Sequence, residues 1–242
     1  MIVLSVGMPR AGSGWHYNLI HDLMKTTGCA DAREIREKYG LQKILTEVNC
    51  NIGVLSVRRL GLVIVPALLG KTFVIKAHSG PTGASRMFEN LGLLRIAYIY
   101  RDPRDAMLSA FDYGQRALQK GHPNAFSHLT DFQKTLDFMS EYVRIWEKWT
   151  QEPKVLLARY EDLLLNYEIE SARLVGFLKL NGDQPEVRAV TGQYRPGAND
   201  ELQGLHYYKG KIGRFREAYT PEQQAELKDK FGVYLKKMGY EE

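Results

Sequence analysis

The sequence is poor in cysteine and has no long apolar segment, and each shortage excludes a class of protein. Its 242 residues include two cysteines, Cys29 and Cys50, which lie outside any C-x-x-C pair and show no zinc-site spacing. We expect free thiols in a reducing compartment instead of a disulfide framework. The longest apolar run, residues 60–70, contains Pro66 and is far shorter than the roughly 20 residues of a membrane span. We interpret it as a core element or a pocket wall.

The sequence also has no internal repeats, low-complexity segments or long runs of Lys or Arg, and we expect no signal peptide. The apolar residues Ile2–Val6 begin at once and are too few for the core of a signal peptide. Hydrophobic residues make up 44% of the chain, which is enough for the core of one α/β domain. We therefore expect a single domain over residues 1–242, in the cytoplasm, with no membrane or nucleic-acid partner. The sequence does not predict the oligomeric state.

Charge does not decide the function. The formal net charge is 33 − 28 = +5. This mild basic excess fits an anionic ligand, and it fits a solvated basic surface equally well.

The chain does show an alternation of strand and helix patterns. Short runs of β-branched or aliphatic residues alternate with segments whose apolar residues recur at helical spacing. This alternation predicts a three-layer α/β fold, in which a central parallel sheet is flanked by helices on both faces. We predict strands over residues 2–6, 72–76, 95–100 and 154–159, and helices over residues 13–24, 103–118, 129–149, 160–179 and 221–238, the last with Thr220 as N-cap.

A glycine-rich turn, residues 7–15, follows the first strand and opens the first helix. In that position a row of backbone N–H groups at a helix N-terminus binds phosphate, although a tight turn that binds nothing has the same pattern. The nucleotide-hydrolase motif G-x-x-x-x-G-K-S/T fits at Gly7 and Gly12, but Ser13 and Gly14 replace its Lys and its Mg²⁺-binding hydroxyl. An enzyme that splits ATP or GTP should keep both.

The stretch M-P-R-A-G-S-G-W resembles the 5′-phosphosulfate loop of the cytosolic-type sulfotransferases, usually Y-P-K-S-G-T-T-W. Arg10 replaces the Lys, and Gly14 replaces the second Thr and so removes one hydroxyl. Trp15 lies where its ring could cover a purine, or it is an ordinary core residue. The resemblance implies that the donor 3′-phosphoadenosine-5′-phosphosulfate (PAPS) is held by Arg10, Ala11, Gly12, Ser13, Gly14 and Trp15.

The second segment with this resemblance, Y-R-D-P-R-D-A-M-L-S, is similar to the family's 3′-phosphate site, R-N/D-P-K/R-D-x-x-x-S. The resemblance implies that Arg101 and Ser109 bind the 3′-phosphate. The chemistry agrees, because an arginine at a strand end offers forked charge-assisted hydrogen bonds and a serine two helical turns later adds a neutral donor. The alternative for Arg101 is an ion pair with Asp105 at the start of the helix.

Lys76-Ala77-His78 resembles the family's K-T-H and ends the second predicted strand, where α/β sheets place their ligands. The resemblance implies that His78 is the general base and that Lys76 contacts the transferring group. Tyr160, in a stretch similar to Y-E-D-L, would contact the adenine. The segment 208–215 resembles R-K-G-x-x-G-x-W, which closes over the 3′-phosphate: Lys209 and Gly210 keep the pattern, Tyr208 replaces its Arg, and Lys211 or Arg214 could compensate.

Together these segments are identified as those of a PAPS-dependent sulfotransferase with a fold like that of P-loop NTPases. The resemblance implies sulfuryl transfer to a hydroxyl or amine of a small-molecule acceptor, with His78 as base, Lys76 and Arg10 at the leaving group, and no metal. A P-loop kinase for a nucleotide or small alcohol is the first alternative. A non-catalytic nucleotide-binding module is the second, favoured by Gly14 and Tyr208 and opposed by the retained Lys76 and His78. The acceptor is not readable, although Phe111, Tyr113 and the apolar run at residues 60–69 are candidates for its pocket.

Overall fold

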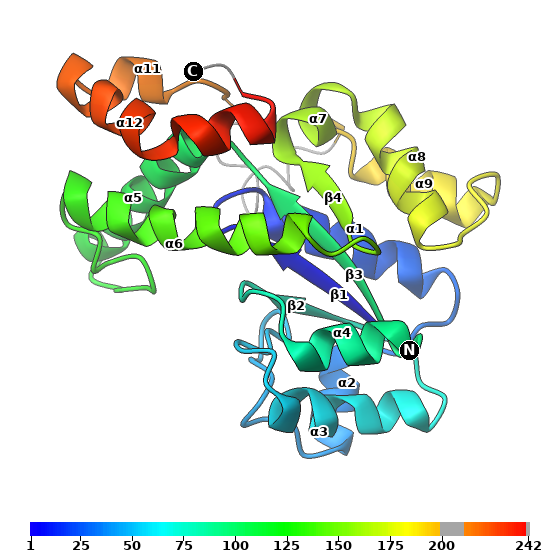
Figure 1. Cartoon of the computed structure of the whole chain (residues 1–242). Helices are drawn as coiled ribbons and strands as arrows, with labels where there is room; N and C mark the ends of the chain where they lie inside the picture. Colours follow the sequence, from blue (N-terminus) through cyan, green and yellow to red (C-terminus); the bar gives the residue numbers. More distant parts are fainter. Residues whose placement is uncertain (199–210, 241–242) are drawn as a thin grey trace.

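The computed structural model describes residues 1–198 and 211–240 and has a sheet of parallel strands at its centre (Figure 1). The strand order is β2-β1-β3-β4, and every registered pair is parallel, which confirms the predicted sheet. The strands are β1 (Ile2–Gly7), β2 (Phe73–Ala77), β3 (Leu94–Tyr100) and β4 (Leu156–Arg159).

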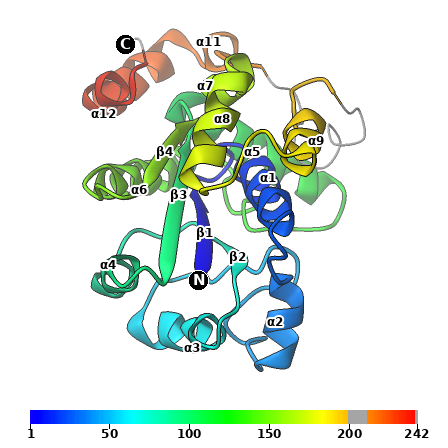
Figure 2. The ribbon, with the colours of Figure 1, turned by 90° about the vertical axis from the view of Figure 1, so that its right-hand side faces the viewer.

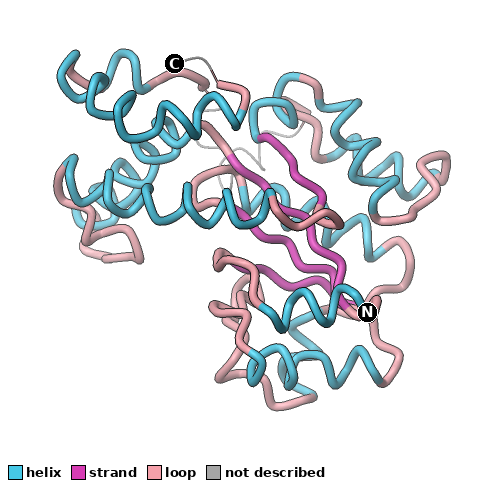
Figure 3. Tube along the Cα trace, in the orientation of Figure 1, coloured by secondary structure: helices cyan, strands magenta, loops and turns pink. Residues whose placement is uncertain are grey.

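Helices surround the strands and cover both faces of the sheet (Figure 3). Along β1, Leu4 and Val6 belong to one hydrophobic cluster and Val3 belongs to another, so successive side chains point to opposite faces. Figure 2 shows α4 and α6 on one side of the strands and α1 on the other. The helices are α1 (Ser13–Lys25), α2 (Ala32–Lys38), α3 (Val57–Leu68), α4 (Gly83–Asn90), α5 (Pro103–Gln119), α6 (Phe132–Thr150), α7 (Tyr160–Leu165), α8 (Tyr167–Phe177), α9 (Pro185–Gln193), α11 (Phe215–Ala218) and α12 (Pro221–Met238).

The carboxyl ends of the strands meet at one edge of the sheet because all the strands run the same way. The connection from β2 to β3 crosses β1, so the strand order reverses direction beside β1. Open α/β sheets bind ligands in the crevice that such a reversal creates at the carboxyl ends. The glycine turn follows β1 at this edge, Lys76 and His78 lie at the end of β2, and Arg101 and Tyr160 follow β3 and β4.

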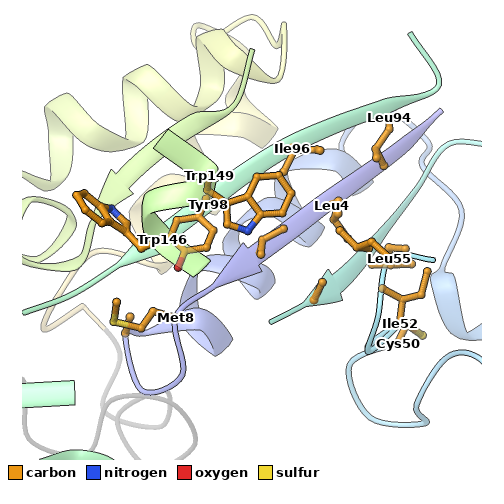
Figure 4. Packing of buried hydrophobic residues seen from close by; sticks show 14 of the residues in the cluster. Leu4, Met8, Cys50, Ile52, Leu55, Leu94, Ile96, Tyr98, Trp146 and Trp149 are labelled. Carbon is orange, nitrogen blue, oxygen red and sulfur yellow. The ribbon is translucent and has the colours of Figure 1, made fainter. Parts of the chain in front are cut away.

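Trp149 attaches α6 to the segment that follows β2. Its ring is fully buried beside Tyr98, with 6.0 Å between the ring centroids (Figure 4). Its Nε1 donates a hydrogen bond to the carbonyl oxygen of Ser79 at 3.1 Å. Because Ser79 directly follows His78, this contact fixes the backbone beside the predicted base.

Asn166 divides the helix that the sequence predicts over residues 160–179. Its backbone, at φ −121° and ψ 41°, lies outside the helical region, and it ends α7 and precedes α8. The prediction of one continuous helix is wrong here, because asparagine readily adopts non-helical conformations. The new direction lets Tyr167 stack on Trp15, with 6.1 Å between the ring centroids.

Two other predictions from the sequence, the cap of α12 and the free cysteines, agree with the structure. Thr220 caps α12, and its hydroxyl and the side chain of Gln223 bond reciprocally to each other's backbone N–H groups. Cys29 and Cys50 are free thiols. Within residues 1–198 and 211–240, no helix combines the length and the apolar character that crossing a bilayer requires.

Two helix glycines test how tightly α5 packs. A Cβ on Gly114 would lie 2.2 Å from the carbonyl oxygen of Phe126, whereas a Cβ on Gly232 in α12 would meet nothing. Alanine is about 1 kcal/mol better than glycine inside a helix, but overpacking a rigid backbone contact costs about 1–3 kcal/mol. We expect Gly114→Ala to lower the free energy of unfolding by up to about 2 kcal/mol and Gly232→Ala to raise it by about 0.5–1 kcal/mol. Urea denaturation measures both, and shifts in the same direction would contradict this packing.

Candidate active site

The glycine turn depends on a close contact with Tyr160. Gly12 has φ 73°, in the left-handed region, and a Cβ there would lie 2.7 Å from Cδ2 of Tyr160. Glycine is therefore required both by the backbone and by the neighbouring ring. No side chain caps the first turn of α1, so the backbone N–H groups at Ser13 and Gly14 remain directed at the strand-end edge. Ala11 is fully buried beneath the turn.

Arg10 bridges the two predicted phosphate sites. Its Nε donates to Oγ of Ser109 at 3.2 Å, and its guanidinium lies 4.4 Å from the ring centroid of Tyr113 and 5.9 Å from that of Phe126. The structure therefore brings together Arg10, which the sequence assigned to the 5′-phosphosulfate, and Ser109, which it assigned to the 3′-phosphate. Tyr113, which the sequence suggested for an acceptor pocket, contacts the guanidinium of Arg10.

Lys76 is a buried cation without a carboxylate partner. Its side chain is 6% exposed, and it forms no ion pair with any residue of the described ranges. Burial, and secondarily the charge of Arg10, lowers the pKa of Lys76 to about 8. A buried charge is expensive unless it is paired. The structure thus contains a position that an anion would stabilise.

His78 is oriented by a backbone hydrogen bond. Its Nδ1 donates to the carbonyl oxygen of Gly7 at 2.6 Å, which leaves the Nε2 lone pair available as a proton acceptor. Burial, followed by the charge of Lys76, lowers the pKa of His78 to about 4, so the ring is neutral at pH 7. The bond also joins the end of β2 to the start of the glycine turn.

Arg101 contacts four separate segments. One Nη donates to the carbonyl oxygen of Lys211 at 2.9 Å, the other reaches the carbonyl oxygen of Arg10 at 3.5 Å, and the guanidinium lies 4.6 Å from the ring centroid of Tyr160. The ion pair with Asp105 considered from the sequence is present as well, at 3.6 Å. The buried Nε of Arg101 has no hydrogen-bond partner, although it forms an ion pair with Oε1 of Glu161 at 4.0 Å.

The rings of Trp15 and Tyr160 are both packed inside the protein. Trp15 is 8% exposed, donates from Nε1 to the carbonyl oxygen of Tyr194, and meets Tyr160 edge-on with 6.3 Å between centroids. The core position that the sequence left open for Trp15 is therefore where its ring lies. Tyr160 sits between Gly12 and Arg101, at the junction of the two phosphate-site segments.

Asp105 holds the segment that the sequence compared with the closing motif. Its carboxylate accepts hydrogen bonds from the backbone N–H groups of Gly213 at 2.6 Å and Phe215 at 3.1 Å. Arg214 pairs with Asp112 at 2.7 Å. This segment is thereby fixed beside Arg101. Three residues of the predicted site, Tyr208, Lys209 and Gly210, lie outside the described residues.

Several site residues were missed from the sequence or given no role. Glu161 accepts hydrogen bonds from the backbone N–H of Asp102 and the hydroxyl of Tyr240, and burial raises its pKa. His16 lies under the turn, bonded to Ser5 at 3.0 Å, and burial lowers its pKa to about 3. The sequence offered a signal for Glu161 only, because this residue belongs to the stretch similar to Y-E-D-L. His16 could not be distinguished in the sequence from any other polar residue on a helix.

The sequence as a whole matches one family. Residues 2–239 match the sulfotransferase domain. The chain belongs to the sulfotransferase domain family. An amine sulfotransferase of Oryctolagus cuniculus is 23% identical over 167 residues, which cover 56% of this chain and 55% of that protein. The chain spans about half the length of the curated relatives it matches.

Solved structures agree on the fold of this sulfotransferase domain. A mouse sulfotransferase crystallised with PAP (3′-phosphoadenosine-5′-phosphate) matches with a TM-score of 0.59 and 15% identity, over 97% of this chain and 84% of that one. Retinol dehydratase in complex with androsterone and the inactive cofactor PAP matches with a TM-score of 0.59 and 20% identity, over 97% of this chain and 80% of that one. At such identities the likeness establishes the fold, and it confirms the predicted P-loop-like architecture.

The buried charge of Lys76 should limit the stability of the ligand-free sulfotransferase domain. Its pKa falls from 10.5 to about 8 on folding, so the unfolded chain binds more protons between these pH values and stability rises with pH there. Below pH 8, Lys76 is protonated in both the folded and the unfolded state, so the full free-energy cost of burying its charge applies. We expect Lys76→Met to raise the free energy of unfolding at pH 7 by roughly 2–3 kcal/mol, and by less at pH 9.5.

Urea denaturation at the two pH values measures this effect. The exposed Lys71, in the turn before β2, gives the matched control Lys71→Met, for which no change is expected at either pH. A Lys76→Met protein that is less stable than wild type at pH 7 would show that an unrecognised partner stabilises the ammonium.

Proposed function

We propose that this chain is a PAPS-dependent sulfotransferase that transfers a sulfuryl group to a hydroxyl or amine of a small-molecule acceptor. The observation that carries the proposal is the position of Lys76 and His78: an unpaired buried cation and an oriented neutral imidazole at the end of β2, beside the glycine turn. Membership of the sulfotransferase domain family supports it. When bound, PAPS supplies the sulfuryl group and departs as 3′-phosphoadenosine-5′-phosphate (PAP).

The residues of the site fit a ligand with two separated anionic groups. On the β1–β2 side, Lys76 and the uncapped first turn of α1 favour negative charge. On the β3 side, Nε of Arg101 is a buried donor without a hydrogen bond, and the hydroxyl of Ser109 can donate to a phosphate while it accepts from Arg10. Arg10 links the two sides. We assign the 5′-phosphosulfate to the first side and the 3′-phosphate to the second.

His78 acts as the general base in this proposal. The bond from Nδ1 to Gly7 directs Nε2 toward the edge of the sheet, where it accepts the proton of the attacking hydroxyl or amine. A pKa of about 4 makes a weak base, but an anion beside the ring favours the imidazolium and raises that pKa. The base thus gains strength when the anionic donor is bound.

Lys76 and Arg10 stabilise the negative charge that develops on the departing oxygen. Both are already in place before the reaction, so little reorganisation is needed, which is the condition under which electrostatic stabilisation is most effective. Arg10 keeps its charge throughout, because a guanidinium does not lose its proton in proteins.

Similarity and the site support a proposal for the acceptor class. One curated relative is an amine sulfotransferase, and one structural neighbour holds androsterone. Near Arg10, Tyr113 and Phe126 meet edge-on with 5.8 Å between centroids, and Phe126 meets Phe138 in the same way. We propose that these rings contact an apolar or aromatic part of the acceptor.

Replacing the base should separate turnover from binding. A positioned base contributes about 10²–10⁴-fold to the rate, so we expect His78→Ala to lower turnover by about that factor and to bind PAP almost as wild type does. His78→Asn keeps an N–H group that can bond to Gly7 and should be equally slow, since it has no basic nitrogen. Transfer of label from PAPS to a panel of alcohols and amines measures turnover, and calorimetry measures PAP binding.

The exposed His122 provides the matched control, and His122→Ala should behave as wild type. A His78→Asn protein that retains most of its rate would exclude His78 as the base. Loss of PAP binding in both His78 variants would instead assign the ring to ligand binding.

A further inference from the structure

Helix α3 exposes an apolar face to solvent. One face of the helix enters the core through Leu60, Val63 and Ile64. The opposite face is apolar too, and its side chains are between 43% and 69% exposed. We call it the α3 apolar face and define it by Val57, Leu62, Val65, Leu68 and Leu69.

The α3 apolar face is continuous around the outside of the helix. At 100° per residue its members fall within an arc of about 140°, in which Arg58 is the one charged residue. Surface helices normally turn charged or polar residues outward, and helices that are apolar all round are normally buried. Yet α3 lies at the outer edge of the molecule in both views (Figures 1 and 2).

The segment that contains this face carries charges of one sign. Residues 48–88 contain no Asp or Glu. Arg58 and Lys71 are exposed at the two ends of the face, and neither forms an ion pair with a residue of the described ranges. The exposed Arg86 of the neighbouring α4 pairs with Glu152. An apolar strip with unpaired cations at its ends complements a surface that is apolar inside and anionic outside.

We propose that the α3 apolar face docks on an anionic membrane surface. Its aliphatic side chains would lie at the boundary between headgroups and acyl chains, and Arg58 and Lys71 would contact headgroup phosphates. A second copy of the chain is a poorer occupant, because a two-fold contact would set the same cation-rimmed patches against each other. The proposal revises the expectation, made from the sequence, that no membrane takes part, and it needs no spanning helix.

Docking through α3 uses none of the side chains of the candidate active site. Leu69 belongs to the turn that leads into the start of β2, whereas Lys76 and His78 lie at the other end of that strand. At the opposite end of the face, Val57 follows a segment that approaches the site, because the backbone N–H of Ile52 donates to the carbonyl oxygen of Lys76. This inference does not depend on the proposed reaction, and the variants that test it do not touch the site.

Sedimentation with lipid vesicles tests the proposal. We expect the full chain to bind vesicles of equimolar phosphatidylcholine and phosphatidylglycerol at low salt, and to bind phosphatidylcholine alone at least 10-fold more weakly, given about five-fold per cation near an anionic surface. The triple variant Leu62→Gln, Val65→Gln, Leu69→Gln should lose binding by about 10-fold or more, since each buried aliphatic side chain contributes substantially. The double variant Arg58→Gln, Lys71→Gln should lose binding to the anionic vesicles by about 10-fold or more.

A second triple variant provides the matched control. Leu165, Ile169 and Val233 are as exposed as the most exposed residues of the α3 apolar face, at 70%, 69% and 69%, but lie on other helices. Their replacement by Gln should leave vesicle binding unchanged. Wild-type protein that does not bind the anionic vesicles, or variants of either α3 set that bind as wild type does, would overturn the proposal. So would light scattering that shows a dimer broken by the α3 triple variant without vesicle binding.

Discussion

The rest of this structure depends on one feature, the buried and positively charged side chain of Lys76, which has no carboxylate beside it among the described residues. Within the described ranges, Lys76 has no ion-pair partner, and burial lowers its pKa to about 8. The parallel strands bring it to the same edge as the first turn of α1, whose free N–H groups are also electropositive. Such an arrangement is costly when empty and becomes favourable when an anion binds, so the protein must hold it in place by contacts made elsewhere.

Those contacts use the nearby carboxylates. Asp102 binds Arg104 through both oxygens, Asp105 accepts from the backbone of Gly213 and Phe215, and Glu161 accepts from Tyr240. Asp105 and Glu161 join segments of the site, Asp102 holds the neighbouring Arg104, and none of the three neutralises Lys76. Arg101 completes the assembly, because it reaches the glycine turn, Tyr160 and Lys211 at once. These groups therefore hold the candidate site together and leave the positive charge of Lys76 available for a ligand.

The sequence predicted the parts of this account that depend on short-range patterns. Strands of continuous apolar residues and the helix that starts at Thr220 and Pro221 were placed nearly to the residue, and the motif spacing located Arg10, Lys76, His78 and Arg101 at strand ends. It could not predict contacts across long separations, such as Asp105 with Gly213. It missed α2, α3 and α4 because their caps, Asp31, Ser56 and Thr82, lie before short or unusually apolar segments. The break at Asn166 was also not predicted: the non-helical backbone of this asparagine interrupts the helical periodicity and lets Tyr167 stack on Trp15.

The central claim is that residues at the carboxyl ends of the strands bind two phosphate groups, one at the 5′ position and one at the 3′ position of an adenosine. Calorimetric titration of one protein preparation with PAP, with adenosine 5′-phosphate and with ATP and Mg²⁺ tests it most directly. The account predicts that PAP binds at least about 100-fold more tightly than adenosine 5′-phosphate, because the second phosphate adds charge-assisted hydrogen bonds to Arg101 and Ser109. Equal affinities for the two nucleotides, or tightest binding of ATP with Mg²⁺, would contradict it.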